Sequence, residues 1–216
     1  MSIFMMLKLL FQGLSLSALV FFVTLAFSLP LGLILCFGRM SKNCIIRNIT
    51  KLYISIMRGT PLMLQLFVVF FGPYYLFGIR MGSSYRTPAI LIGFVINYAA
   101  YFAEIYRGGI ESIPVGQYEA AKLLGYNKFQ TFTRIIFPQV IKRITPPVTN
   151  EIITLVKDTS LAFVLSMVEM FTVAKQIAAA QTSMTPYFLA GAIYYIINLA
   201  IAMISEKIEK KMSFYR

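Results

Sequence analysis

Apolar residues run in long stretches along this chain, and charged residues are largely confined to the segments between them. The stretches cover residues 9–37, 60–79, 88–106, 152–171 and 186–204. Each is close to or longer than the roughly 20 residues that a helix needs to cross the hydrocarbon core of a bilayer. The pattern therefore predicts an all-α membrane protein with five transmembrane helices in a single transmembrane domain, residues 1–216.

The composition also indicates a protein that is embedded in a lipid bilayer. Of the 216 residues, 58% are hydrophobic and only 13% are charged, and the chain has no His and no Trp. A soluble domain of this length cannot bury so much apolar surface in one core. A membrane-embedded enzyme also has little support, because no Ser or Cys stands beside a plausible base.

Basic residues mark one side of the membrane. The net charge is +12, and most of the Lys and Arg residues fall within 39–58, 107–143 and 207–216. Cytoplasmic loops of membrane proteins are enriched in Lys and Arg, so this bias predicts an N-terminus outside and a C-terminus in the cytosol. Topology accounts for the charge, and a nucleic-acid partner is not indicated.

The segment between the third and fourth stretches, about 107–147, is far longer than the 2–8 residues usual between packed helices. Residues 117–124 are mostly good helix formers, and Gly125 follows where a left-handed C-terminal cap is favoured. Asn127 then offers the N-cap of another helix. We expect two short helices separated at this point.

The second of these helices is amphipathic and leads the chain back to the membrane. Its apolar face carries Phe129, Phe132, Ile135 and Ile136. Pro138 lacks a backbone N–H and is expected to interrupt the hydrogen-bond ladder, ending the helix.

The first short helix suits contact with another surface. Glu119 lies near its start, where the helix dipole favours a carboxylate, and the small side chains of Ala120 and Ala121 permit close approach. Two interpretations remain open. The helix docks on a partner protein, or it lies on anionic lipid as an interfacial amphipathic helix.

The same segment resembles the EAA loop of the permease subunits of bacterial ABC importers. The matching positions are Glu119, Ala120, Ala121, Gly125, Ile135 and Pro138. The resemblance implies a type I importer permease fold in the bacterial cytoplasmic membrane. It also implies that the loop forms a coupling helix inserted into a groove of a separate ATPase, with these residues at the contact.

The resemblance implies several partners: two ABC ATPase subunits, a second permease subunit that is identical or related, an extracytoplasmic solute-binding protein, and membrane lipid. Five helices are few to enclose a solute pathway, which also favours a dimer. No G-x-x-x-x-G-K-[ST] motif occurs in the chain, so ATP and Mg are expected on the partner ATPase. We expect no catalytic residue, metal or cofactor on this chain.

Two further segments resemble the polar amino-acid subgroup of these permeases. One runs from Arg58 to Pro61 and is followed by Gln65, and the other runs from Lys157 to Leu161. The resemblance implies a polar or charged amino acid as solute, with cystine and glutamine in range. Gln65, one turn into its span, is a candidate for the solute pathway.

Lys157 and Asp158 place opposite charges inside the fourth span, where charges are costly unless paired or hydrated. Neighbouring residues of a regular helix point about 100° apart, so either the helix is irregular here or each charge has its own partner. An interrupted helix would turn the hydroxyls of Thr159 and Ser160 toward a solute cavity.

A structural ion pair is the other interpretation of these charges, with Glu104, Arg107 or Glu151 as partner. A different functional class would use Lys157, Asp158 and Glu104 as the titrating relay of an ion-gradient-driven transporter. The long cytosolic segment favours the ATP-driven class, because an ion-driven transporter needs no docking arm.

Two other polar residues are candidates for the pathway. Glu169, near the outer end of the fourth span, either faces the entrance or extends to the lipid headgroups, and the second is favoured. Asn97, in the third span, is expected first to hydrogen-bond between helices and second to contact solute. Glu104 and Arg107, three residues apart, are expected to pair.

Overall fold

The computed structural model describes residues 1–212 of the chain, and this part is helical with no strand. The α-helices are α1 (Ile3–Arg39), α2 (Cys44–Gly59), α3 (Leu62–Phe77), α4 (Arg86–Glu111), α5 (Val115–Leu123), α6 (Lys128–Gln130), α7 (Phe137–Asp158), α8 (Met170–Gln181) and α9 (Thr185–Lys211). Turns of 3₁₀ helix cover Ser83–Tyr85 (η1) and Thr159–Leu165 (η3), and a π-helix covers Thr131–Ile136 (η2). The end of the basic C-terminal tail, including Arg216, lies outside the described residues.

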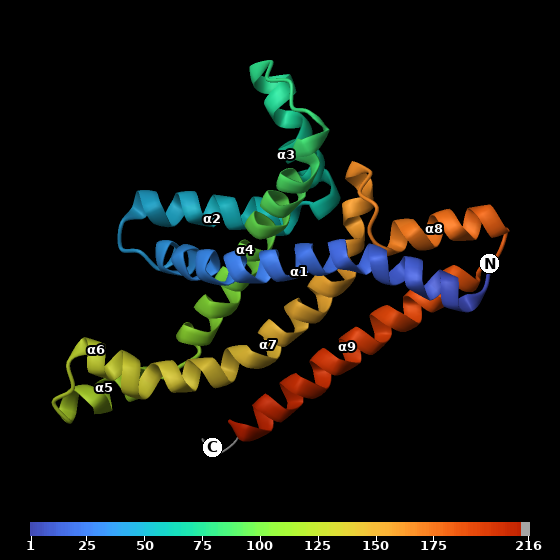
Figure 1. Ribbon diagram of the computed structural model, residues 1–216. Coiled ribbons are helices and arrows are strands. Elements are labelled where there is room, and N and C mark those ends of the chain that lie inside the picture. Colours follow the sequence, from blue (N-terminus) through green and yellow to red (C-terminus); the bar gives the residue numbers. More distant parts are fainter. Residues whose placement is uncertain (213–216) are drawn as a thin grey trace.

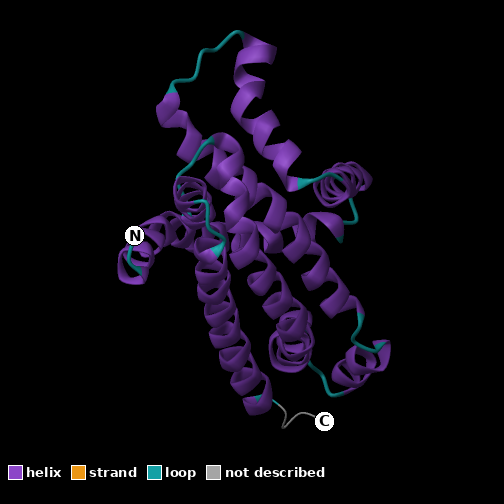
Figure 2. Cartoon of the chain, turned by 90° about the vertical axis from the view of Figure 1, so that its right-hand side faces the viewer, coloured by secondary structure: helices purple, strands orange, loops and turns teal. Residues whose placement is uncertain are grey.

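Helices account for nearly all of the described chain, and the loops lie at the ends of helices (Figure 2). Within the described residues, α1, α4 and α9 are each long and apolar enough to cross a membrane. Two bent pairs also pass this test: α2 with α3, at 112°, and the segment Lys128–Leu165 with α8, at 62°. The predicted five spans therefore correspond to counting each bent pair as one span.

The predicted helix at 60–79 is only the second half of such a bent element. Helix α2 ends at Gly59, and Thr60 is extended, with φ −123° and ψ 148°. The ring of Pro61 disfavours the α conformation at the residue before it, which explains why the break falls here. A new helix, α3, then starts in another direction.

The predicted helix at 152–171 is wrong as a single element. Helix α7 ends at Asp158, the chain continues as η3, and Ser166 adopts a left-handed conformation with φ +58°. Glu169 then caps the start of α8. The fourth apolar stretch is therefore a junction between helices, because a side-chain cap starts a new helix inside it.

The predicted end of a helix at Pro138 is also wrong. This residue lies in the first turn of α7, at the change from π-helical to α-helical hydrogen bonding, and the helix continues through it. The π-helix η2 directly precedes it and joins α6 to α7 without a loop. Because α4 extends to Glu111 and α7 begins at Phe137, the chain between these two helices is residues 112–136, and the predicted bounds of the cytosolic loop, 107–147, stay a prediction.

The core forms where α1 crosses α4 (Figure 1). Phe94, Tyr98 and Phe102 of α4 are buried against Val20 of α1 and Leu66 of α3. A Cβ at Gly32 of α1 would lie 2.8 Å from the Cβ of Phe102, so glycine is needed for this close approach. Helices α7 and α9 lie on one side of α1, and α2 lies on the other.

Candidate functional site

The chain between α4 and α7, residues 112–136, forms an arm at one end of the molecule (Figure 1). Helix α5 of the arm presents Glu119 and Ala120 to the outside, whereas Ala121 is buried against the rest of the chain. Partial burial raises the pKa of the neighbouring Tyr118 hydroxyl above its ordinary value, so this group stays protonated at neutral pH.

The turn after α5 needs a glycine. Gly125 has φ +78°, its N–H donates to the carbonyl of Lys122 at 3.0 Å, and the N–H of Tyr126 donates to the carbonyl of Ala121 at 3.0 Å. These two bonds form a Schellman motif, which satisfies carbonyls left free at a helix end. The predicted left-handed cap is confirmed.

The second turn of the arm is fixed by a capping box. The Asn127 side chain accepts the N–H of Gln130 at 2.9 Å, and the Gln130 side chain accepts the N–H of Asn127 at 3.0 Å. The predicted N-cap is thus confirmed. Together the two caps hold α5 against η2 in one orientation.

The apolar face predicted for 128–137 is only partly correct. Ile136 is fully buried with Ile113, and Phe132 and Ile135 pack around them, but Phe129 is 75% exposed. The π-helix advances each residue by a smaller angle than an α-helix, so Phe129 falls outside the face that its spacing predicted.

The arm carries an exposed apolar patch that the sequence pattern did not reveal. Val115, Leu123, Leu124 and Phe129 are each at least 70% exposed. Val115 and Leu123 belong to α5, Leu124 directly follows it and Phe129 lies in α6. Large apolar residues exposed this densely on one short segment mark interaction surfaces. Two leucines directly before the capping glycine were the available signal in the sequence.

Gln65 and Asn97 form a hydrogen-bonded lock at the bend between α2 and α3. The Gln65 amide donates to the carbonyls of Met57 and Thr60 at 2.9 and 3.1 Å, and it accepts from Asn97 at 2.9 Å. Asn97 also donates to the carbonyl of Met57 at 3.2 Å. Both side chains are buried, so the geometry gives them a structural role, as expected first for Asn97.

Asp158 is held by α4. The hydroxyl of Tyr98 donates to its carboxylate at 2.7 Å, and Glu151 is close enough to interact electrostatically with it. Lys157 is exposed and Asp158 is partly buried, so the two adjacent charges point in different directions, as neighbours on a regular helix do, and Asp158 has a partner of its own. Among the described residues Asp158 has no ion-pair partner within 4 Å.

The hydroxyls after Asp158 bond to the backbone of the preceding turn, although Thr159 also belongs to the lining of a cavity of about 400 Å³ between α1, α7 and α9. Thr159 donates to the carbonyl of Val156 and Ser160 donates to the carbonyl of Lys157, each at 2.8 Å. The helix is interrupted here, as one interpretation expected, but these side chains satisfy carbonyls released by the change to 3₁₀ geometry.

Neither predicted placement of Glu169 is correct. Its side chain is fully buried and accepts the N–H of Phe171 at 2.6 Å and the N–H and hydroxyl of Thr172 at 2.7 and 2.8 Å. A carboxylate at a helix N-terminus is stabilised by these donors and by the helix dipole. Since this residue caps α8, it reaches neither headgroups nor an entrance.

The predicted pair of Glu104 and Arg107 is confirmed, and it belongs to a larger cluster. Arg107 donates to both carboxylate oxygens of Glu104, at 3.1 and 3.2 Å from its Nε, and it also pairs with Glu111. Arg39 of α1 and Arg58 of α2 lie 3.6 and 3.9 Å from the same Glu104.

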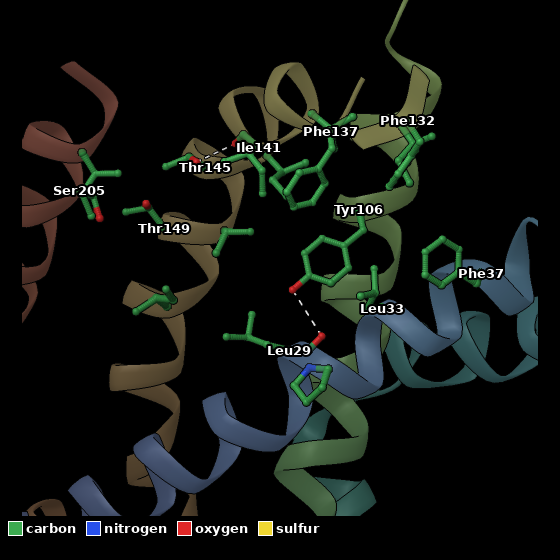
Figure 3. Close-up of a pocket in the computed structure, with 17 residues that line it drawn as sticks. Leu29, Leu33, Phe37, Tyr106, Phe132, Phe137, Ile141, Thr145, Thr149 and Ser205 are labelled. Atoms are coloured by element: carbon green, nitrogen blue, oxygen red, sulfur yellow. Dashed lines mark hydrogen bonds between the residues drawn. The ribbon is translucent and has the colours of Figure 1, made fainter. Parts of the chain in front are cut away.

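A cavity of about 520 Å³ lies between α1, α4, α7 and α9, and the labelled side chains point into it (Figure 3). Phe37 of α1, Tyr106 of α4 and Phe137 and Ile141 of α7 belong to its lining. The hydroxyl of Tyr106 donates to the carbonyl of Leu29 at 3.5 Å rather than into the space. A lining so apolar does not suit a polar amino acid.

Residues 28–214 match the family model described as "Binding-protein-dependent transport system inner membrane component". The chain is 39% identical over 205 residues to the probable amino-acid ABC transporter permease protein YckA of Bacillus subtilis, covering 94% of this chain and 89% of the relative. It is 37% identical over 191 residues to the L-cystine transport system permease protein TcyB of the same organism, covering 88% and 80%.

A solved structure described as an amino acid ABC transporter with histidines superimposes with a TM-score of 0.86. The two chains are 29% identical, and the match covers 98% of this chain and 99% of the other. The two chains therefore share one fold over nearly their whole length, and the helix bends and the arm lie within the shared part.

Proposed function

This chain belongs to the family of binding-protein-dependent transport system inner membrane components, and on that premise we propose that it is the permease subunit of an ABC importer that carries polar amino acids into the bacterial cytoplasm. ATP hydrolysis in such importers belongs to a separate nucleotide-binding subunit. The ion-gradient-driven alternative is not favoured by any of these relatives.

The arm carries the proposal. Helix α5 is held in one orientation by two caps and exposes Glu119, Ala120, Leu123 and Leu124. This combination of a carboxylate, a small residue and two large apolar side chains suits a groove on an ATPase. ATP-driven closure of two ATPases would move the arms of two permease subunits together and reorient their spans.

The proposed assembly contains two ATPase subunits, a second permease subunit, an extracytoplasmic solute-binding protein and surrounding lipid. The second permease subunit is a copy of this chain or a relative. ATP and Mg bind on the ATPases, with no cofactor on this chain. In the proposed topology each bent pair counts as one of five spans, and the bias of basic residues supports an N-terminus outside and an arm and C-terminus in the cytosol.

The acidic pair Glu151 and Asp158 is the proposed contact for the ammonium group of the solute. The two residues are partly buried and seven positions apart on α7, which is two helical turns, so they lie on one side of the helix, where a cation offsets the cost of two carboxylates. Tyr98 fixes the second carboxylate by its hydrogen bond. The side chains of Gln65, Asn97, Thr159, Ser160 and Glu169 form hydrogen bonds within the protein, which supports a structural role for them. Solute contacts at these five residues and at Lys157 stay predictions.

The experiment is co-purification of the chain with its ATPase. A Glu119→Lys variant should lose most of the bound ATPase, while a Glu206→Lys variant, which makes the same charge change at the exposed cytosolic end of α9, should retain it. Equal amounts of co-purified ATPase in both variants would contradict the docking role of the arm. Solute uptake driven by an ion gradient without ATP would overturn the proposed function itself.

A further inference from the structure

A second cavity, of about 610 Å³, lies at the junction of α1, α2 and α4. Its lining residues are Arg39, Lys51, Ile54, Ser55, Arg58, Gly59, Tyr101 and Glu104. Three of these side chains are cationic and one is anionic. The cavity therefore carries an excess of positive charge, unlike the apolar cavity described above.

The single carboxylate does not satisfy the guanidinium groups of the cavity. Glu104 accepts its hydrogen bonds from Arg107, which lies outside the lining. Arg39 and Arg58 approach Glu104 only to 3.6 and 3.9 Å, beyond hydrogen-bond length. Within residues 1–212 neither guanidinium donates a hydrogen bond, so two sets of charged N–H donors are available in the cavity.

The cationic groups are arranged around one space. Lys51 and Arg58 are seven residues apart on α2, two helical turns, and Ser55 lies between them on the same face. The guanidinium of Arg58 lies over the ring of Tyr101, 5.3 Å from its centroid, which fixes its plane. Arg39 enters from the last turn of α1.

We propose that this cavity is an anion site that binds the α-carboxylate of an amino acid. The planar fork of an arginine matches the two oxygens of a carboxylate, and Lys51 adds a third positive charge. Ser55 offers a hydroxyl donor on the same face. The identity of the ligand as an amino acid rests on the proposed function, whereas the affinity for a carboxylate rests on the cavity alone.

The position of the site relates it to the acidic pair. Arg58 lies over Tyr101, which is one helical turn along α4 from Tyr98, the residue that donates to Asp158, so the cavity lies near the groups proposed to hold the ammonium. Arg39, at the end of α1 that carries the basic loop, marks the cytosolic side. In this proposal, an amino acid that leaves the pathway passes its carboxylate to this site.

The test measures binding by calorimetry to the permease–ATPase complex, without binding protein, in nanodiscs of zwitterionic lipid. The probes are the standard L-amino acids and L-cystine, each compared with its α-amide, and inorganic phosphate. The variants are Arg39→Gln and Lys51→Gln. The control is Arg47→Gln, which removes the same kind of charge from an exposed position of α2 outside the cavity.

We expect at least one amino acid to bind and its α-amide to bind roughly tenfold or more weakly, because charge-assisted hydrogen bonds to the carboxylate are lost. Arg39→Gln and Lys51→Gln should each weaken that binding about tenfold, and Arg47→Gln should not. Lys51 is exposed and its replacement leaves the fold intact, so a loss of binding in this variant reports on the site.

Equal affinity for acid and amide, absence of any amino-acid binding, or unchanged binding in both cavity variants overturns the proposal. Tighter binding of phosphate than of any amino acid, or binding that appears only when phosphatidylglycerol is added, identifies a phosphate ligand and also overturns it. ATP-driven uptake is measured on the same preparation with the binding protein. Intact uptake in these cases leaves the proposed function standing.

Discussion

The hydroxyl of Tyr98 donates a hydrogen bond of 2.7 Å to the carboxylate of Asp158, and this bond joins the centre of α4 to the point where α7 ends. The contact connects residues sixty positions apart. It fixes a carboxylate beside the break between α7 and α8, where the proposed pathway needs a negative charge in a defined position.

A Tyr98→Phe variant tests this relationship. The buried ring keeps its packing, but the partly buried carboxylate of Asp158 loses its donor, at a cost of up to about 1–3 kcal/mol. We expect a lower melting temperature of the purified complex and reduced ATP-driven uptake. Tyr195→Phe is the control, since Tyr195 is 67% exposed on α9. Equal effects of the two changes would show that the hydrogen bond has no special role.

The lock between Gln65 and Asn97 predicts non-additive mutations. Gln65→Leu removes one donor from the carbonyl of Met57 and one from that of Thr60, and it leaves Asn97 with only its bond to Met57, at a cost of roughly 1–3 kcal/mol. Asn97→Leu removes part of the same network. In a double-mutant cycle on unfolding free energy, we expect the double variant to lose less than the sum of the single losses. Strict additivity would contradict a shared network.

Two adjacent glycines of α4 offer a matched pair. A Cβ at Gly109 would lie 2.2 Å from Cγ2 of Ile144, whereas a Cβ at Gly108 meets nothing within 4 Å. Gly109→Ala should destabilise the complex by about 1–3 kcal/mol because α4 and α7 must move apart. Gly108→Ala should be neutral or stabilising by up to about 1 kcal/mol, since alanine favours a helix. Thermal unfolding of both variants measures the difference, and equal melting temperatures would contradict the close approach of α4 to α7 at Gly109.

The left-handed glycine of the arm predicts loss of coupling. A β-branched side chain is strained at φ +78°, so Gly125→Val should disturb the Schellman cap and reorient α5. We expect solute-stimulated ATPase activity of the reconstituted complex to fall severalfold.

Gly78→Val is the control for that change. Gly78 also has a positive φ, +68°, and a Cβ there meets nothing within 4 Å, but it lies at the end of α3 away from the arm. The backbone strain is comparable, so it should not by itself reduce ATPase stimulation. A similar loss in both variants would assign the effect to general strain.

The buried cap of α8 predicts a larger stability effect than an exposed cap. Glu169→Ala leaves the N–H groups of Phe171 and Thr172 unsatisfied in a buried site, so the loss should be about 2 kcal/mol or more. Ser2→Ala removes the exposed N-cap of α1 and should cost about 1 kcal/mol or less. Melting temperatures of the two variants give the comparison, and a smaller effect at Glu169 would contradict its capping role.

The amino-acid sequence by itself determined the features that depend on neighbouring residues. Apolar stretches of spanning length identify an all-α membrane protein, because a helix that crosses lipid needs such a stretch regardless of how the helices pack against one another. The glycine at 125 and the asparagine at 127 gave the two turns of the arm, since left-handed backbone and N-capping are local properties. The spaced EAA-loop residues gave the family.

Only the tertiary structure decided which polar groups meet. Glu169 became a helix cap because the chain turns sharply before α8, and Gln65 became a lock because α2 and α3 meet at 112°. Arg39, Lys51 and Arg58 line one cavity because α1 and α2 both pack against α4. Such contacts depend on the directions in which helices leave their breaks, which the periodicity of a linear sequence does not encode.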